Sequence, residues 1–175
     1  ARGSVNVSLV NENGKLRIML RSSFYIDTHA KRKVNDTVCK QQYTYIGAMV
    51  SNNSVNHRSN YITLNRGSTD GIIKDMGVIC ATGVVGVVVD VTEHLSVVKS
   101  VLHKTTIVSS MLVDNRDLCS FKWSDDLDPN KGVLYDVSTT VKPRIGERVV
   151  TSGYSTFFPA GIAVGRVSKV NGKGG

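Results

Sequence analysis

The 175-residue sequence has little of what marks several common protein classes. It contains three cysteines, three prolines and 6% aromatic residues, which excludes collagen-like chains and disulfide-rich scaffolds. It lacks a run of about 18 apolar residues, so no membrane-spanning helix is predicted within it, and no signal peptide is recognisable. A membrane anchor, if the native protein has one, is expected outside these residues.

Sequence signs of a metal or cofactor site are absent as well. Cys39, Cys80 and Cys119 are widely spaced and form no CxxC pair, and the four histidines show no metal-binding spacing. A glycine-rich phosphate-binding string with its lysine is also missing. The sequence therefore predicts no metal site and no cofactor.

A serine hydrolase is the first enzymatic alternative. Ser152 and Ser155 are candidate nucleophiles, but Phe157 stands where a nucleophile elbow around Ser155 would need glycine. A paired-barrel hydrolase could still recruit His57, an aspartate and a serine from separate strands. This alternative stays open, while the main prediction is that no residue is catalytic.

The positive charge is unevenly placed. The formal net charge is +8, and residues 1–41 supply +5 of it, with eight basic and three acidic residues. The cluster Lys31–Lys33 could attract anionic lipid or nucleic acid, or belong to a solvated linker. A nucleic-acid-binding β-barrel is a second alternative, although the region after residue 41 lacks interleaved basic and aromatic residues.

What the sequence does have is valine and glycine. Its 27 valines favour pleated, half-buried strands, and its 16 glycines supply turns. From Tyr43 onward, short extended runs alternate with turn residues, which predicts an antiparallel barrel or sandwich. Val84–Val91 is apolar on both faces, so we expect a central strand in which Gly86 marks a bulge, a bend or a close backbone approach.

The first residues show a different pattern. Residues 1–26 are expected to be the C-terminal end of a coiled-coil helix. Residues 27–41 have no periodicity and are expected to form a linker. The candidate coiled-coil residues, taken from a heptad repeat, are Leu9, Asn13, Leu16 and Leu20.

Several strings after residue 42 resemble, in order and spacing, the MreC family of rod shape-determining proteins. The strongest is GERVVTSG at 146–153, where Glu147 replaces the aspartate usual in the family and keeps its charge. The resemblance covers about residues 42–170. The remaining strings are YTYIGAMV at 43–50, NYITLNRGSTDGI at 60–72, DMGVI at 75–79, GVVGV at 83–87, FPAGI at 158–162 and VGRV at 164–167.

The resemblance implies an all-β fold of two small antiparallel β-barrel-like subdomains, preceded by the end of a coiled-coil helix. We expect the first subdomain at residues 42–98 and the second at 99–175, with strand 162–170 free to return to the first. The implied function is a non-enzymatic scaffold of the bacterial cell-wall elongation machinery. Such a scaffold maintains cell shape from the periplasmic side of the inner membrane.

The resemblance also implies partners. They are the elongation transpeptidase (a penicillin-binding protein), MreD and other rod-complex proteins. A homo-oligomer is expected, in a full-length protein anchored to the membrane, and nucleic acid is not. The basic cluster Lys31–Lys33 would then face lipid or peptidoglycan.

Two groups of site residues are predicted. Interface cores favour aromatic side chains, so the candidate protein-binding residues are Tyr154, Phe157 and Trp123, while Phe158 is expected in the core. A positive φ is expected at Gly67 and Gly71. Asp70 is expected to bond its own backbone. The candidate structural turn residues are Gly67, Asp70, Gly71, Gly83, Gly86, Gly153, Pro159, Gly161 and Gly165.

Overall fold

The computed structural model describes residues 3–8, 16–21, 31–36, 41–54, 57–124 and 128–171, with side chains from residue 45 onward. Apart from the single 3-10 turn η1 (Ser68–Asp70), every regular element in these residues is a β-strand. All paired strands run antiparallel. The predicted all-β fold is confirmed. Within the same residues, no helix is long and apolar enough to cross a membrane.

Six strands form a closed barrel in the order β1–β12–β11–β10–β13–β14. Along β10 and β11 buried residues alternate with more exposed ones, so one side of each strand fills the barrel. Phe121 and Leu134, both fully buried, lie in this core. The barrel strands are β1 (Gly3–Ser8), β10 (Ile107–Leu112), β11 (Leu118–Trp123), β12 (Lys131–Val137), β13 (Arg148–Thr151) and β14 (Ala163–Val170).

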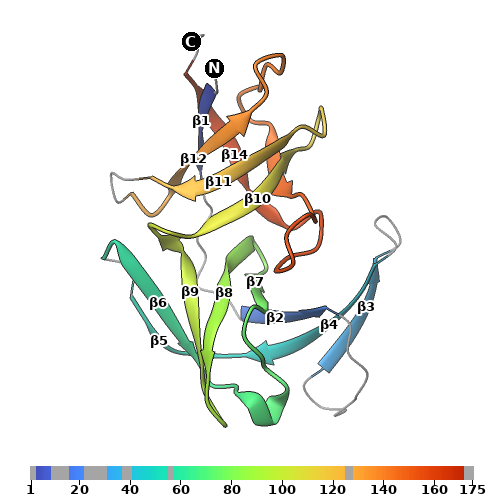
Figure 1. The fold of residues 1–175 in the computed structure, drawn as a ribbon, viewed down its shortest axis with the longest axis vertical. Coiled ribbons are helices and arrows are strands. Elements are labelled where there is room, and N and C mark those ends of the chain that lie inside the picture. Colours follow the sequence, from blue (N-terminus) through green and yellow to red (C-terminus); the bar gives the residue numbers. More distant parts are fainter. Residues whose placement is uncertain are drawn as a thin grey trace.

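The other eight strands form one sheet in the order β3–β4–β2–β7–β8–β9–β6–β5. Figure 1 shows this sheet below the barrel along the long axis of the molecule. The chain starts in the barrel with β1, crosses the whole sheet, and returns to the barrel for β10 onward. The sheet strands are β2 (Leu16–Arg21), β3 (Lys31–Asp36), β4 (Gln41–Ala48), β5 (Val50–Asn53), β6 (Ser59–Leu64), β7 (Gly77–Cys80), β8 (Gly83–Val91) and β9 (Ser96–His103).

The sheet curls where β4 continues into β5. Only Met49 separates the two strands, yet β4 pairs with β2 and β3 while β5 pairs with β6. The N–H of Met49 donates to Asn65 Oδ1 (2.7 Å), the N–H of Asn65 donates to the Met49 carbonyl (3.0 Å), and Arg66 Nε donates to the Gly47 carbonyl (3.2 Å). The bend therefore brings the end of β6 against β4. The core of the sheet consists of Ile46, Ala48, Ile62, Leu64, Ile72, Met76, Val78, Val88 and Val98.

Strand β8 is buried on both faces around its middle, as the sequence predicts. Val87 contributes to a core that extends into the barrel, whereas Val88 contributes to the core of the sheet. Gly86, directly before Val87, allows the backbone of β9 to approach β8 closely, because a Cβ there would lie 2.2 Å from the Lys99 carbonyl oxygen. Barrel and sheet are thus joined by shared hydrophobic packing.

The predicted coiled-coil helix is wrong for the residues that the structure describes. Strand β1 closes the barrel between β12 and β14, and β2 lies between β4 and β7. Leu16 and Leu20 are four residues apart, which fits one face of a helix, but with Ile18 they also share one side of a strand. The backbone pairing of β2 with both β4 and β7 makes these residues a strand and not a helix. Leu9 and Asn13 lie outside the described residues.

Three expected boundaries also differ in the structure. The linker at 27–41 contains β3, which pairs with β4. The expected boundary between residues 98 and 99 falls inside β9, and the chain passes to the barrel only between His103 and Ile107. Strand β14 pairs with β1 and β13, so it belongs to the barrel and does not return to the sheet.

Candidate protein-binding site

The turn after β6 is held together by one carboxylate. Asp70 Oδ2 accepts the Gly67 N–H (3.0 Å), and Asp70 Oδ1 accepts a bond from Arg66 Nη1 (2.9 Å). Gly71 ends the 3-10 turn with φ +88°, a left-handed conformation that favours glycine. The side chain of Asp70 therefore bonds to nearby backbone, as expected, but to the N–H of Gly67, three residues earlier in the chain.

A second set of bonds ties the same turn to the β8–β9 connection. The N–H of Ser68 donates to the Thr92 carbonyl (2.8 Å), and the N–H of Thr69 donates to the Glu93 carbonyl (3.2 Å). The positive φ expected at Gly67 is wrong, since its φ is −138°. Glycine is required there by space, because a Cβ would lie 2.3 Å from the Thr92 oxygen. The string at 60–72 therefore has a structural role, since its turn is bonded to the β8–β9 connection.

The string at 146–153 closes the base of another loop. Thr151 Oγ1 donates to the Pro159 carbonyl and accepts the Ile162 N–H (2.9 Å). The N–H of Gly161 donates to the Thr151 carbonyl (2.9 Å). Gly153 and Gly161 have φ values of +79° and +89°. We call residues 152–161 the junction loop, because the loop starts in the barrel and reaches the sheet.

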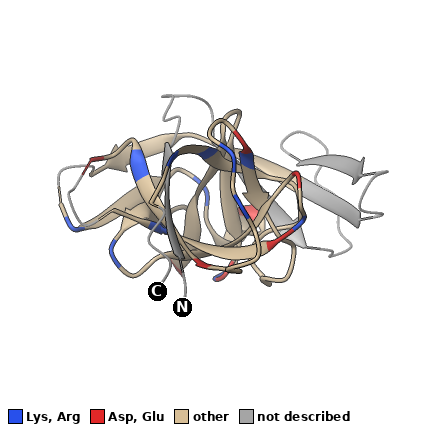
Figure 2. Cartoon of the chain, turned by 90° about the horizontal axis from the view of Figure 1, so that it is seen from above, with Lys and Arg blue, Asp and Glu red and all other residues tan. Residues whose placement is uncertain are grey.

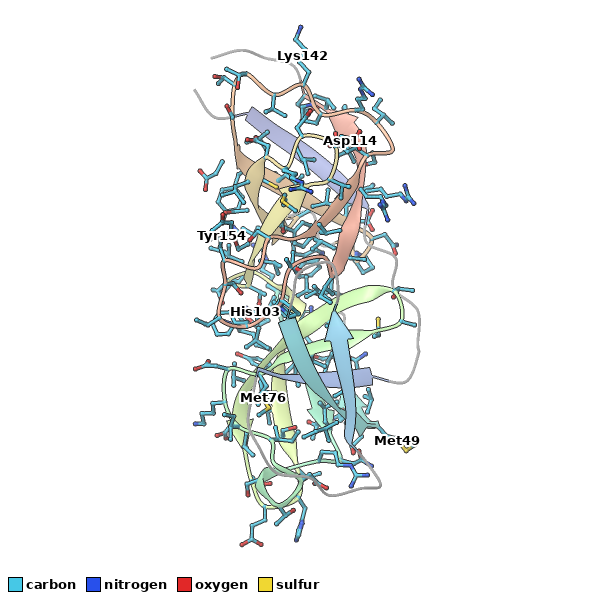
Figure 3. The ribbon with its side chains drawn as sticks, turned by 90° about the vertical axis from the view of Figure 1, so that its right-hand side faces the viewer. Met49, Met76, His103, Asp114, Lys142 and Tyr154 are labelled. Atoms are coloured by element: carbon cyan, nitrogen blue, oxygen red, sulfur yellow. The ribbon has the colours of Figure 1, made fainter. Side chains whose placement is uncertain are left out.

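The junction loop buries one aromatic side chain and exposes two. Phe158 is 3% exposed and packs over Gly77 of β7, where an added Cβ would lie 2.6 Å from its ring. Tyr154 is 80% exposed and Phe157 is 36% exposed. Figure 3 shows Tyr154 at the margin of the molecule, at the level where barrel and sheet meet. The loop can therefore offer Tyr154 and Phe157 to a partner while Phe158 anchors it.

Other predicted site residues lie elsewhere. Trp123 is 3% exposed and its Nε1 donates to the Asp128 carbonyl (2.7 Å), so it is a core residue and its predicted binding role is wrong. Gly86 and Gly165 lie inside β8 and β14 rather than in turns. Gly83 begins β8 with φ +142°.

The candidate nucleophiles have no histidine partner in the part of the chain that the structure describes. Ser152 Oγ lies 2.7 Å from Ser109 Oγ and accepts the Tyr154 N–H (3.3 Å). Ser155 Oγ accepts the Phe157 N–H (3.1 Å). These hydroxyls shape the junction loop, and no group of three His, Cys, Asp or Glu in that part of the chain could hold a metal ion.

His103 is buried at the end of β9, where the chain leaves the sheet. Its Nδ1 accepts the Thr105 N–H (3.1 Å), and its Nε2 lies 3.2 Å from Tyr61 Oη. Because Nδ1 accepts, the ring is neutral and Nε2 carries the proton that points to the tyrosine. Burial first, and then the charges of Lys99 and Lys104, hold the pKa of His103 below its usual value. The geometry gives this histidine a structural role.

Charges of both signs are interspersed over the described residues, as Figure 2 shows from above. Some form ion pairs, such as the exposed pair Lys74 and Asp90 (3.1 Å) and the partly exposed pair Lys131 and Asp128 (2.8 Å). The hydrogen bond from Lys74 is the main cause that lowers the pKa of Asp90. A nucleic-acid groove lined by basic residues would need a more uniform surface.

Comparison with known proteins identifies the family. Residues 50–175 match the family model described as "Rod shape-determining protein MreC, barrel core". The chain belongs to the MreC family. The cell shape-determining protein MreC of Listeria monocytogenes is 27% identical over 143 residues, which are 80% of this chain and 48% of that protein. This chain thus spans about half the length of that curated relative.

Solved MreC structures share the fold. MreC of Listeria monocytogenes superposes with a TM-score of 0.63 at 25% identity, over 70% of this chain and 59% of that one. MreC in a complex with the penicillin-binding protein PBP2 from Helicobacter pylori gives 0.56 at 22% identity, over 70% and 75%. A structure described as the major periplasmic domain of the cell shape-determining filament MreC gives 0.57 at 20% identity, over 82% and 81%.

One exposed apolar side chain of the barrel, that of Ile145, was not predicted from the sequence. Ile145 is 74% exposed in the loop before β13. The signal available in the sequence was an isoleucine two residues after Pro143 and directly before Gly146, since proline and glycine favour turns at the surface.

Proposed function

We propose that the chain is a non-enzymatic scaffold of the bacterial cell-wall elongation machinery on the periplasmic side of the inner membrane. It binds the elongation transpeptidase, MreD and other rod-complex proteins, and it self-associates. Support comes from its membership of a shape-determining family. Further support comes from the Helicobacter pylori relative solved with a penicillin-binding protein, and from the neighbour described as a periplasmic domain of a filament.

The observation that carries this proposal is the junction loop. Its base is fixed by the bonds of Thr151, and its middle is anchored by Phe158. The backbone around Tyr154 and Phe157 is therefore ordered before a partner arrives, which reduces the entropy lost on binding. Exposed aromatic side chains on a stiff support are typical of the residues that dominate interface energies.

The test measures binding of the elongation penicillin-binding protein from the same organism to full-length variants. Tyr154→Ala is expected to weaken this binding by about tenfold or more, and Phe157→Ala by less because it is more buried. The melting temperature should not change. Ile73→Ala is the matched control, since Ile73 is 63% exposed but follows η1, away from the junction loop.

Two results would contradict the proposal. One is equal binding by Tyr154→Ala and the unaltered protein, both to the transpeptidase and to itself in sedimentation experiments. The other is stoichiometric labelling of Ser152 or Ser155 by a serine-directed covalent probe, which would favour the hydrolase alternative. A fall in melting temperature together with lost binding would make Tyr154 a core residue instead.

A further inference from the structure

Ile145 is the most exposed large aliphatic side chain among the described residues, at 74%. It occupies a tight turn in which the N–H of Glu147 donates to the Arg144 carbonyl (3.0 Å). Gly146, at φ +87°, allows the chain to reverse there. The isoleucine side chain therefore stands at the tip of a turn, where folding leaves it in water.

This turn is stiff. The buried carboxylate of Glu147 accepts the N–H groups of Arg144 (3.0 Å) and Asp114 (3.2 Å). The N–H of Gly146 donates to the Val167 carbonyl (2.7 Å), and Arg166 Nη1 donates to the Gly146 carbonyl (3.0 Å). These bonds tie the turn to β14 and to the β10–β11 turn. The exposure of Ile145 is thus imposed by the fold rather than by a slack loop.

Four exposed basic side chains lie on this turn and on the β13–β14 ladder beside it. They belong to Lys142, Arg144, Arg148 and Arg166, and the last two stand directly opposite each other across the ladder. Like charges in such a pair destabilise a sheet. We name the exposed group the barrel tip; it consists of Lys142, Arg144, Ile145, Arg148 and Arg166.

The charge of the barrel tip is not neutralised within the described residues. The ion pairs found there join other side chains, and none involves a residue of the barrel tip. Glu147, in the middle of the turn, is occupied by backbone amides. The facing β10–β11 connection adds Asp114, Arg116 and Asp117, which is one net negative charge against the four cations of the barrel tip. A net positive surface remains around the isoleucine.

Lys142 of the barrel tip lies at an end of the molecule. Figure 3 shows Lys142 projecting from the end of the barrel that is farthest from the sheet, with Asp114 on the same side. Both line a groove between the two turns, together with Arg144 and Glu147. A broad, flat surface can therefore approach this end without meeting the sheet.

We propose that the barrel tip docks on the surface of an anionic phospholipid bilayer. An acidic protein segment or a nucleic acid would neutralise the four cations but would gain little from an exposed isoleucine. A bilayer rewards both features, because its phosphates attract the basic side chains while Ile145 enters the boundary with the acyl chains. The contact is peripheral and separate from the junction loop.

The test is co-sedimentation with vesicles of phosphatidylglycerol and phosphatidylcholine, and with vesicles of phosphatidylcholine alone. Every variant keeps residues 1–41, so that their basic residues contribute equally. Ile145→Ser is expected to lower the partition coefficient on anionic vesicles about tenfold. The double change Arg144→Gln and Arg148→Gln is expected to lower it about 25-fold, at about fivefold for each basic side chain.

Matched controls remove side chains of the same kind elsewhere. Ile73→Ser and the double change Lys104→Gln and Lys122→Gln should leave the partition coefficient nearly unchanged. Melting temperatures show that each variant is folded. An environment-sensitive fluorophore on Ile145→Cys, with Cys39 and Cys80 replaced by serine, should shift its emission to shorter wavelength on anionic vesicles.

Three outcomes overturn the proposal. The first is a loss with the controls equal to the loss with the barrel-tip variants, which would indicate unspecific attraction. The second is a loss with the arginine changes but not with Ile145→Ser, which would show attraction between charges alone, with no entry of Ile145 into the bilayer. The third is an unshifted emission from the fluorophore at position 145 on vesicles that bind the protein.

Discussion

The barrel and the sheet are closed in different ways. In the barrel, six strands hydrogen-bond in a ring, so each strand has two neighbours. The sheet keeps two edges, at β3 and β5, and its curl depends on bonds from Asn65 and the side chain of Arg66 to the β4–β5 bend. The backbone hydrogen bonds of a ladder do not require particular side chains. The bonds made by the side chains of Asn65 and Arg66, which we call the clamp, do require them.

This difference predicts which substitutions each part tolerates. Loss of a polar turn residue should matter more in the sheet, where Asp70 positions Arg66 in the clamp, than in a barrel hairpin. Loss of core volume should affect both parts together, because Ile79, Val87 and Val101 of the sheet belong to the core that fills the barrel.

The largest expected effect comes from Phe121→Ala. Phe121 is fully buried, and its ring lies where a Cβ on Gly132 would be 2.1 Å away. The change should lower the free energy of unfolding by about 3–5 kcal/mol, since it removes a ring and leaves a cavity. Urea denaturation measures this, with Trp123 fluorescence reporting on the barrel and far-ultraviolet circular dichroism on both parts.

The two signals should coincide in the variant and in the unaltered protein, since a shared core predicts one cooperative transition. Leu64→Ala, in the core of the sheet, is the matched control and should lower the unfolding free energy by about 2–5 kcal/mol, again in one transition. Two separate transitions would show that barrel and sheet are independent.

A smaller effect is expected from Asp70→Ala. The change leaves the Gly67 N–H without its acceptor and frees Arg66, so the free energy of unfolding should fall by about 1–3 kcal/mol. The matched change is Asp128→Ala in the barrel. Asp128 also accepts one backbone N–H, that of Asn130 (2.9 Å), and one basic side chain, that of Lys131 (2.8 Å).

Asp128→Ala should have little effect on stability, because the β11–β12 ladder holds its turn. The Lys131 hydrogen bond is the main cause that lowers the pKa of Asp128, but the pair is partly exposed and partly screened by solvent. Equal losses from both changes, compared in urea at neutral pH, would show that the sheet depends no more on its clamp than the barrel does on its turns.

The local sequence pattern was enough to predict a strand that is buried on both faces. Val84–Val91 is apolar at nearly every position, which fits only a strand between two layers, and β8 has this position. The same reasoning failed for β2, because Leu16 and Leu20 are compatible with both helix and strand. What decides there is pairing with β4 and β7, which are far away in the sequence.

The candidate site was predictable to a similar extent. Crowding of aromatic residues at 154–158 indicated a loop with a binding surface and a plug, and the structure exposes Tyr154 and buries Phe158. Trp123 could not be assigned in this way, since the local sequence does not show that it is buried or that the Asp128 carbonyl accepts its indole N–H. The exposure of Ile145 follows from Glu147 reaching two amides, one of them 33 residues away in the sequence.

The smallest expected effect concerns the connection between the two parts. His103 is neutral in the folded protein, and its lowered pKa means that the unfolded chain binds a proton more readily. Stability from this group is therefore complete well above pH 6.5 and is lost as the pH falls below it. A protonated Nδ1 would also set two donors against each other, because the Thr105 N–H already points at it.

His103→Gln removes the titrating group and should flatten this part of the stability curve while lowering stability at pH 8. The measurement is the urea midpoint between pH 8 and pH 5, with His94→Gln as the control, since the side chain of His94 is 78% exposed. Tyr61→Phe, which removes the hydroxyl facing Nε2, should keep the dependence on pH but weaken the connection. If His103→Gln and the unaltered protein lose stability in parallel on acidification, another group is responsible, and the connection between sheet and barrel is not the acid-sensitive point.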